Sequence, residues 1–251
     1  MTAISTALGQ SRRVWTIAKK DIRIYYSKGP VVIFGIIFPV FLFLSFMIGR
    51  RLTLDSTMPG LMGMILFFSA TAISPAVVPW ETQARTLERL MSCQVTIPTI
   101  ILGDILASFA FGALIFIVPL LIGISLGMSV SSPILLALAV VLASLCFSSL
   151  GVIFSAAPTN TPSNVMMLSS AVKLPLLFIS GVFIPMNDLP AWGKAVALLS
   201  PLTYFTDAAR HLIQGAGNLP MAVDLLSLLV FTALFLAVAA GLHAKTMTRR
   251  I

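Results

Sequence analysis

Long apolar runs alternate with short polar segments along almost the whole chain. Six runs are long enough to cross the ~30 Å hydrocarbon core of a bilayer as helices. They cover residues 31–48, 58–78, 100–126, 133–156, 164–184 and 221–243. Pro39 lies in the middle of the first run and predicts a kink there. The pattern predicts one transmembrane domain over residues 1–251, an all-α integral membrane protein with six spans.

A basic segment, residues 5–28, precedes the first apolar run. Val14, Ala18 and Tyr25 follow one stripe of a helix, and Gly29 with Pro30 ends it. The polar side carries five cations, Arg12, Arg13, Lys19, Lys20 and Arg23. This arrangement predicts an amphipathic helix that lies in the headgroup layer of the membrane.

The longest charged interruption, residues 81–98, joins the second and third spans. Glu81 and Arg85 are four residues apart, and Arg85 and Glu88 are three apart, so a helix here would gain two side-chain ion pairs. We therefore predict a short amphipathic helix. Two interpretations fit it: a loop helix that rests on lipid headgroups, or a contact surface for a partner protein that moves both spans.

Residues 185–219, between the fifth and sixth spans, are too apolar for a water-exposed loop. Two short helices fit the segment, at 189–199 and 202–215, and Ser200 followed by Pro201 is a typical start for the second. Such helices form either a re-entrant lid, if protein shields their ends, or an interfacial anchor rich in aromatic side chains.

Lys173 is the most unusual charge, because it lies near the middle of the fifth span. An ionisable residue at that depth costs about 3 kcal/mol and normally faces a protein interior or a cavity. Three roles fit the position: a structural pair with Asp104 or snorkelling to the interface, the lining of a substrate path, or the handling of protons or ions.

Composition and charge add the environment and the orientation. Of the 251 residues, 58% are hydrophobic and only 10% are charged, whereas a soluble domain carries about 25% charge. With the N-terminus inside, the inner segments hold eleven Lys and Arg and the outer segments four. The positive-inside rule then predicts a multi-pass protein of the plasma membrane with both termini in the cytoplasm. The net charge of +8 is concentrated at the ends, where it favours anionic lipid headgroups over nucleic acid.

The chain lacks the motifs of intrinsic catalysis. It contains no phosphate-binding GxxxxGK[ST] loop, no HExxH and no GxSxG. Its two histidines are far apart, and Cys93 and Cys146 are isolated, so neither a metal site nor a disulfide framework is expected. A transport subunit, an ATPase-independent six-span channel or ion-driven carrier, and a membrane scaffold all remain compatible with these features.

Four short segments resemble the ABC type-2 transporter permeases, which export drugs, lipids and polysaccharides. AKKDIR at 18–23 with Pro39 is similar to the connecting helix and kinked first span of that family. TLERL at 86–90 resembles its coupling stretch, E-x-E-x-G-T-L-E-x-L, with Gln83 for an acid and Arg85 for the usual glycine. The third segment, SGVFIP at 180–185, and the fourth, SPLTYFTDAAR at 200–210, resemble its S-G-x-x-x-P and N-P-L-T-Y-x-x-D-A-x-R motifs.

This resemblance implies a permease subunit of an ATP-driven exporter for an amphipathic, drug-like, lipid-like or glycan substrate. It implies a second permease copy, identical or related, and a cytoplasmic ATPase subunit that binds ATP and Mg, with no cofactor in this chain. The implied ATPase-coupling residues are Glu81, Arg85, Leu87, Glu88, Arg89 and Met91. The implied substrate path or gate contains Lys173, Gly181, Pro185, Pro201, Tyr204, Asp207 and Arg210.

Overall fold

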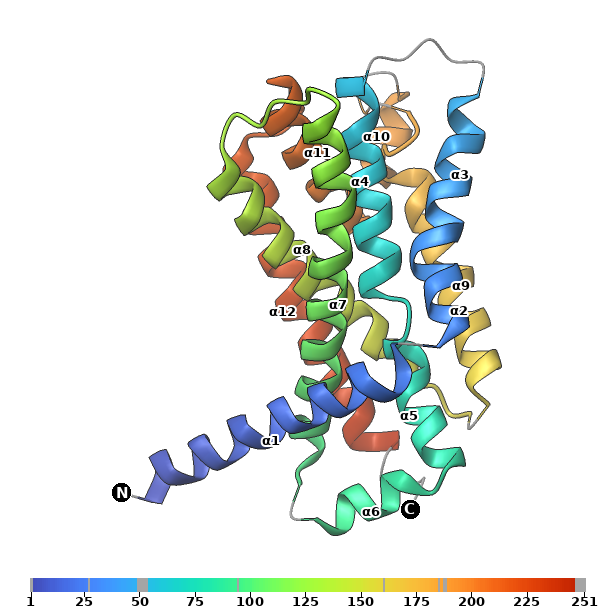
Figure 1. Ribbon diagram of the computed structural model, residues 1–251, viewed down its shortest axis with the longest axis vertical. Helices are drawn as coiled ribbons and strands as arrows, with labels where there is room; N and C mark the ends of the chain where they lie inside the picture. The colour runs from blue at the N-terminus through green and yellow to red at the C-terminus, as the bar shows by residue number, and fades with distance from the viewer. Residues whose placement is uncertain are drawn as a thin grey trace.

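In the computed structural model, the long helices form an upright bundle and one helix lies across its lower end (Figure 1). The structure describes residues 2–26, 28–48, 54–93, 95–159, 161–184, 186 and 189–246, and all regular structure within them is helical. Among these residues, five helices are long and apolar enough to cross a membrane: Ser56–Gln83, Ile97–Ser125, Pro133–Ser155, Pro162–Ile179 and Met221–Thr246. The predicted first span contains a shorter apolar helix, Gly35–Ser45, so the count of six spans stays a prediction.

The second span forms the centre of the bundle. It consists of α4 (Leu54–Ala70) and α5 (Ser74–Gln83), and 94% of its most apolar window is buried. In contrast, only 11% of the corresponding window of α12 (Met221–Thr246) is buried, and Leu226 and Leu234 are more than half exposed. A helix this apolar with so little protein cover requires lipid around it. The chain is therefore a multi-pass membrane protein.

The second span is interrupted, whereas the sequence predicted one continuous run over 58–78. Helix α4 ends at Ala70, and α5 begins only at Ser74. Pro75 lies in the first turn of α5, where its missing N–H removes no helical hydrogen bond. The break leaves carbonyl groups at the end of α4 that need donors from other parts of the chain.

The first span is irregular next to that break. It begins with α2 (Gly29–Val32), continues as a π-helical turn, η1 (Ile33–Ile37), and ends as α3 (Phe38–Met47). Pro39 lies in the first turn of α3, directly after the π-helical turn. Gly35 allows η1 to approach the break, since a Cβ atom there would lie 3.4 Å from the Cβ atom of Ala72. The two irregular segments thus face each other inside the bundle.

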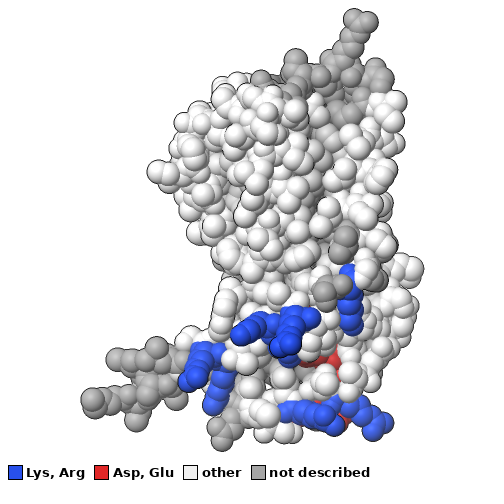
Figure 2. All heavy atoms as spheres, viewed as in Figure 1, with Lys and Arg blue, Asp and Glu red and all other residues white. Residues whose placement is uncertain are grey.

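Helix α1 (Thr2–Tyr25) crosses the lower end of the bundle and packs on α7 (Ile97–Ser125) (Figure 1). The close crossing depends on Gly103, because a Cβ atom at that position would lie 2.5 Å from Cγ2 of Ile17. The short helix α6 (Thr86–Ser92) lies at the same end. Among the described residues, Lys and Arg side chains gather at this end on the face that Figure 2 shows.

Two shorter helices, α10 (Ala191–Ala197) and α11 (Pro201–Gln214), follow α8 (Pro133–Ser155) and α9 (Pro162–Ile179) at the opposite end. Helix α11 packs against α4, α8 and α12, and its residues 201–210 are all buried. The hydroxyl of Ser200 donates to the carbonyl of Leu176 at 3.0 Å and accepts no hydrogen bond from an N–H of α11, in contrast to the predicted cap. A re-entrant position in the bilayer stays a prediction.

Candidate functional site

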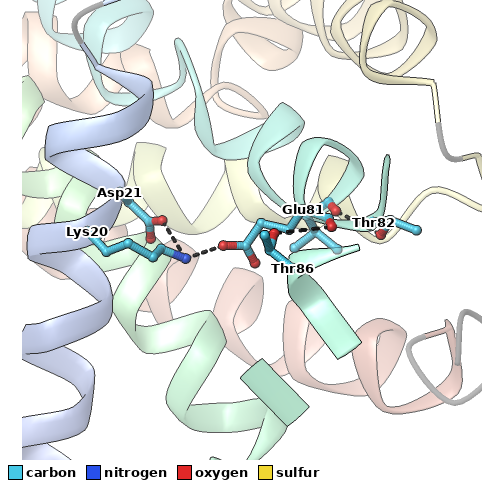
Figure 3. Close-up of polar contacts among 6 residues, drawn as sticks. Lys20, Asp21, Glu81, Thr82 and Thr86 are labelled. Atoms are coloured by element: carbon cyan, nitrogen blue, oxygen red, sulfur yellow. Dashed lines mark hydrogen bonds and ion pairs between the residues drawn. The ribbon is translucent and has the colours of Figure 1, made fainter. Parts of the chain in front are cut away.

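An ion pair ties α1 to the end of the second span. The ammonium of Lys20 on α1 contacts the carboxylate of Glu81 on α5 and lies 3.0 Å from Oδ1 of Asp21 (Figure 3). Glu81 is 1% exposed and Asp21 is fully buried. Removing one member of a buried pair leaves an uncompensated charge, which is strongly destabilising. This contact therefore holds the crosswise helix to the span.

Asp104 on α7 completes a group of three carboxyl side chains around one ammonium. It is buried, and it interacts with the charges of Asp21, Glu81 and Lys20. Burial lowers the pKa of Lys20, but Asp21 and Glu81 raise it by more, so its pKa lies above the usual value. Burial also raises the pKa of Asp21, against the opposing effect of the Lys20 charge. Lys20 thus stays charged.

Aromatic side chains extend this contact. The ring of Tyr25 stacks on that of Trp80, with centroids 5.4 Å apart and an interplanar angle of 11°. The ammonium of Lys28 lies 4.4 Å from the Trp80 centroid and 4.9 Å from the Tyr25 centroid, within the range of a cation–π contact. A hollow of about 520 Å³ opens beside them, and it is lined by residues of α1, α5 and α6 that include Thr86 and Leu90.

A left-handed residue separates α5 from α6, where the sequence predicted a single helix over 81–98. Arg85 adopts φ 53° and ψ 27°, and α6 begins at the next residue. This conformation favours glycine, which has no Cβ atom. The ABC type-2 permeases that this stretch resembles usually have glycine here, and glycine would adopt the left-handed conformation without strain. The predicted pairs of Arg85 with Glu81 and Glu88 are absent from the described structure, because the helix turns at Arg85 and Glu81 pairs with Lys20 instead.

The predicted coupling residues divide into a buried and an exposed set. Leu87 is 2% exposed and packs with Ile17 of α1, and Glu81 is occupied by its pair with Lys20. Arg85, Glu88 and Arg89 are exposed and lie on or next to α6. The Met91 side chain lies outside the described residues. A partner at this end would thus meet the three exposed charged residues first.

The predicted basic helix shows the same division. Arg12, Lys19 and Arg23 are exposed and Arg13 is half-buried, whereas Lys20 turns inward to Glu81. A contact of α1 with lipid headgroups stays a prediction for the exposed cations.

The predicted gate residues lie in and around α11, where they bind the neighbouring loops. Arg210 donates to the carbonyl of Gly181, which adopts φ 73°. The carboxylate of Asp207 accepts hydrogen bonds from Asn218 and from the N–H of Leu219 at 2.8–3.0 Å. Tyr204 donates to the carbonyl of Leu198 at 2.9 Å. Pro201 begins the helix and is buried, and Pro185 lies outside the described residues. These contacts order this end of the bundle, and the role of a gate stays a prediction.

Lys173 lies beside the break in the second span. Its ammonium donates to the carbonyl of Thr71 at 3.3 Å and lies 5.7 Å from the centroid of Phe68. The suggested pair with Asp104 is not found among the described side chains, because Asp104 belongs to the group around Lys20. Lys173 borders a cavity of about 500 Å³ that is lined by Phe38, Phe68, Ala72, Pro75, Ser163, Met166, Met167, Ser169, Ser170 and Leu174.

Sequence reasoning missed several residues of these sites. Asp21 was included in the AKKDIR segment without a role of its own, and Trp80 was not singled out. The spacing of Asp21 and Tyr25, four residues apart on one face, was the available signal. No local signal indicates Thr71, because its carbonyl becomes a site only through the break in the span.

The buried helices define a multi-pass membrane protein. One end of its bundle differs from the other, because the basic helix α1 crosses it and the polar group around Lys20 joins α1 to the bundle. A family model for ABC-2 type transporters matches residues 12–213, which is most of the chain. The chain belongs to this family, as a transmembrane component of an ABC transporter.

Relatives with curated names agree with this assignment. The probable multidrug ABC transporter permease YbhS of Escherichia coli is 24% identical over 182 residues, 71% of this chain and 48% of that protein. The inner membrane transport permease YadH of Escherichia coli is 27% identical over 180 residues, 70% of this chain and 69% of that protein. Nodulation protein J of Rhizobium meliloti is 31% identical over 134 residues, 53% of this chain and 50% of that protein. The chain thus spans about half the length of YbhS and of nodulation protein J.

Proposed function

We propose that this chain is the permease subunit of an ATP-driven exporter in the plasma membrane, and that it works with a second permease copy. Both termini and α6 face the cytoplasm in this proposal. A separate ATPase subunit binds ATP and Mg and docks on α6, and its closure moves the first two spans. The exposed charges of α6 and the pair that joins α1 to α5 support this assignment.

The ion pair is the observation that carries the coupling proposal. Glu81 lies in the last turn of α5, which leads into the α6 turn, and Lys20 belongs to the helix that leads into the first span. A force applied to α6 therefore reaches α5 through the Arg85 turn and α1 through the buried pair. Because η1 lies against Ala72 in the break at 71–73, and α5 begins directly after that break, both transmit the movement toward the centre of the bundle.

The transport path in this proposal passes the cavity beside Lys173 and ends at α10 and α11. The cavity lies between α3, α5 and α9, and its wall is mostly apolar. That lining suits an amphipathic cargo, drug-like, lipid-like or glycan-linked. The name of YbhS, a probable multidrug ABC transporter permease, is consistent with such a cargo.

Reversing the charge of Glu88 tests the docking surface. Glu88 is exposed on α6, so Glu88→Arg should leave the fold intact and uncouple ATP hydrolysis from export. We expect export to fall at least about tenfold, which corresponds to about 1.4 kcal/mol of lost coupling. Glu88→Gln, which removes the charge without reversing it, should have a smaller effect. Unchanged export and ATPase stimulation in well-expressed Glu88→Arg protein would refute the docking site.

Purification with the ATPase subunit tests the function as a whole. The proposal expects the chain to co-purify with an ABC ATPase and to show vanadate-sensitive hydrolysis that substrate stimulates. Flux through proteoliposomes that hold this chain alone would instead favour the six-span channel or ion-driven carrier. A stable complex without hydrolysis or flux would favour the scaffold.

A further inference from the structure

The cavity beside Lys173 contains a buried cation without a buried counter-charge. Lys173 is 7% exposed, and within the described part of the chain its one hydrogen bond is to the carbonyl of Thr71. No carboxylate among the described side chains lies within ion-pair distance of it. An ammonium has three donors, so two remain for another acceptor. Such a charge inside a membrane protein is costly and usually marks a functional site.

A second polar group faces the same cavity. Ser169 is fully buried, one helical turn before Lys173 on α9, and its hydroxyl has no hydrogen-bond partner in the described structure. Buried hydroxyl groups are normally paired. The remaining wall is largely apolar, with Phe38, Phe68 and Leu174 among its members. The cavity thus combines one cation and the buried hydroxyl of Ser169 with a mostly apolar wall, to which Ser163 and Ser170 add further hydroxyl groups.

The cavity also has a direction. Ser163, Met166 and Ser170 line it along one face of α9, from the first turn of that helix up to Lys173. Lys173 comes eleven residues after Pro162, about 17 Å along a helix. A ligand that enters near the start of α9 therefore passes Met166 and the hydroxyl groups of Ser163 and Ser170 before its head meets the ammonium.

We propose that this cavity binds an amphiphile whose head carries a phosphate or a carboxylate, with Lys173 as the residue that selects the negative charge and Ser169 as a second donor. This inference rests on the proposed function, because it names the cargo class of the proposed transport path. Without ligand, the ammonium stabilises the free end of α4 at Thr71. An anionic head accepts hydrogen bonds from the two remaining donors, so binding does not require the loss of the contact between Lys173 and Thr71.

A matched pair of lipids tests the charge selection. Lauroyl lysophosphatidic acid and monolauroyl glycerol differ only in the phosphate, and both are titrated against the full chain in nanodiscs of neutral lipid, with empty nanodiscs as blanks. We expect the phosphate lipid to bind at least tenfold more tightly. Lys173→Met should reduce this preference to about one, Lys173→Arg should retain it, and Lys194→Met, at an exposed position on α10, should leave it unchanged. The wild-type comparison alone decides the case if Lys173→Met does not fold.

Three results would overturn the inference. They are equal binding of the two lipids, a preference for the phosphate lipid that survives Lys173→Met, and tighter binding of dodecyltrimethylammonium, whose head is a cation. Competition identifies the source of the head. If phosphatidic acid in the nanodisc displaces the bound lysophosphatidic acid, the ligand is a lipid of the bilayer. If the lysolipid binds tightly and phosphatidic acid does not displace it, the ligand is a single-chain cargo. Full displacement by inorganic phosphate at the lipid's own concentration would overturn the amphiphile class. The nanodiscs contain no ATPase subunit, so the binding measurement does not depend on ATPase coupling. If coupling fails but the preference for the phosphate lipid is intact, only the proposed function is overturned. If coupling is found without that preference, only this inference is overturned.

Discussion

Among the residues of this protein, charged side chains of the same type have opposite roles according to the helix that packs against them. Lys19 and Lys20 are adjacent on α1, yet Lys19 is exposed and Lys20 forms the pair with Glu81. Lys173 is more buried than either and has a backbone carbonyl as its acceptor. The position of each ammonium thus follows from the acceptors that other helices bring to it.

Replacing Lys20 by Met should release α1 from the bundle. The change leaves Glu81 and Asp21 buried without their cation, a loss on the order of 3 kcal/mol. We expect hydrogen exchange of the α1 amides to become about a hundredfold faster, since each tenfold step corresponds to about 1.4 kcal/mol. Emission of Trp80 should shift to the red in a Trp15→Phe and Trp192→Phe background, because Trp80 stacks on Tyr25 of α1.

Lys19→Met is the matched control and should change neither measurement. The pH dependence gives a second check. Because the pKa of Lys20 is raised in the folded protein, its stabilisation is fully present below the usual lysine value, about 10.4, and is lost as the pH rises through the raised pKa. A Trp80 emission that shifts between pH 7 and 9 would contradict this account.

Among the elements, the three irregular segments, which are the Arg85 turn, the break at 71–73 and η1, have more functional consequences than the regular helices. The turn at Arg85 directs α6 away from α5, the break at 71–73 creates the acceptor for Lys173, and η1 lies against that break. Each interruption lies where a force from the lower end of the bundle would have to pass. We infer that these segments, rather than the rigid α7 and α8, change conformation during transport.

Replacing Arg85 by Gly should stabilise the protein. A left-handed conformation costs a non-glycine residue about 1 kcal/mol, and the Arg85 side chain is exposed, so little packing is lost. We expect a gain of about 0.5–1 kcal/mol, measured as a higher midpoint of thermal unfolding in detergent. Ala84→Gly is the control, because Ala84 has φ −77° and should lose stability with glycine. A lower midpoint for Arg85→Gly would show that the arginine makes contacts that the turn requires.

At the scale of the whole molecule, charge is distributed along the length of the bundle. Among the described residues, Lys and Arg gather near α1 and α6 on the face that Figure 2 shows. The same end carries the three buried carboxyl groups and the exposed charges of α6. This polarity agrees with the positive-inside rule and provides the basis for the proposed cytoplasmic position of that end.

Cysteine labelling tests this orientation. Cys93 is exposed just after α6, whereas Cys146 is buried in α8. In intact cells, a membrane-impermeant maleimide should leave the wild-type chain unlabelled, and permeabilisation should allow one label, at Cys93. In a Cys93→Ala background, Trp192→Cys on the exposed surface of α10 should be labelled in intact cells. Labelling of Cys93 from outside would reverse the proposed orientation.

Comparison of the sequence and the structure shows which features are local. The apolar runs, the basic N-terminal segment and the four family motifs are each contained in a short stretch, and they were enough to indicate an all-helical membrane protein of the ABC-2 type. The single helix predicted for 81–98 was not found, because helical spacing alone does not show that Arg85 turns left-handed or that Glu81 has a stronger partner. The suggested Lys173–Asp104 pair failed for the same reason.

The sequence by itself determined the membrane character, the helical class and the family, because hydrophobicity and motif spacing depend on neighbouring residues. Only the tertiary structure decided which charges meet. Lys20 and Glu81 are 61 residues apart in the chain, and Lys173 and Thr71 are 102 apart. A buried ammonium needs an acceptor nearby, and whether one is present depends on the packing of distant helices. The proposed coupling contact and the proposed anion site both arise from that packing.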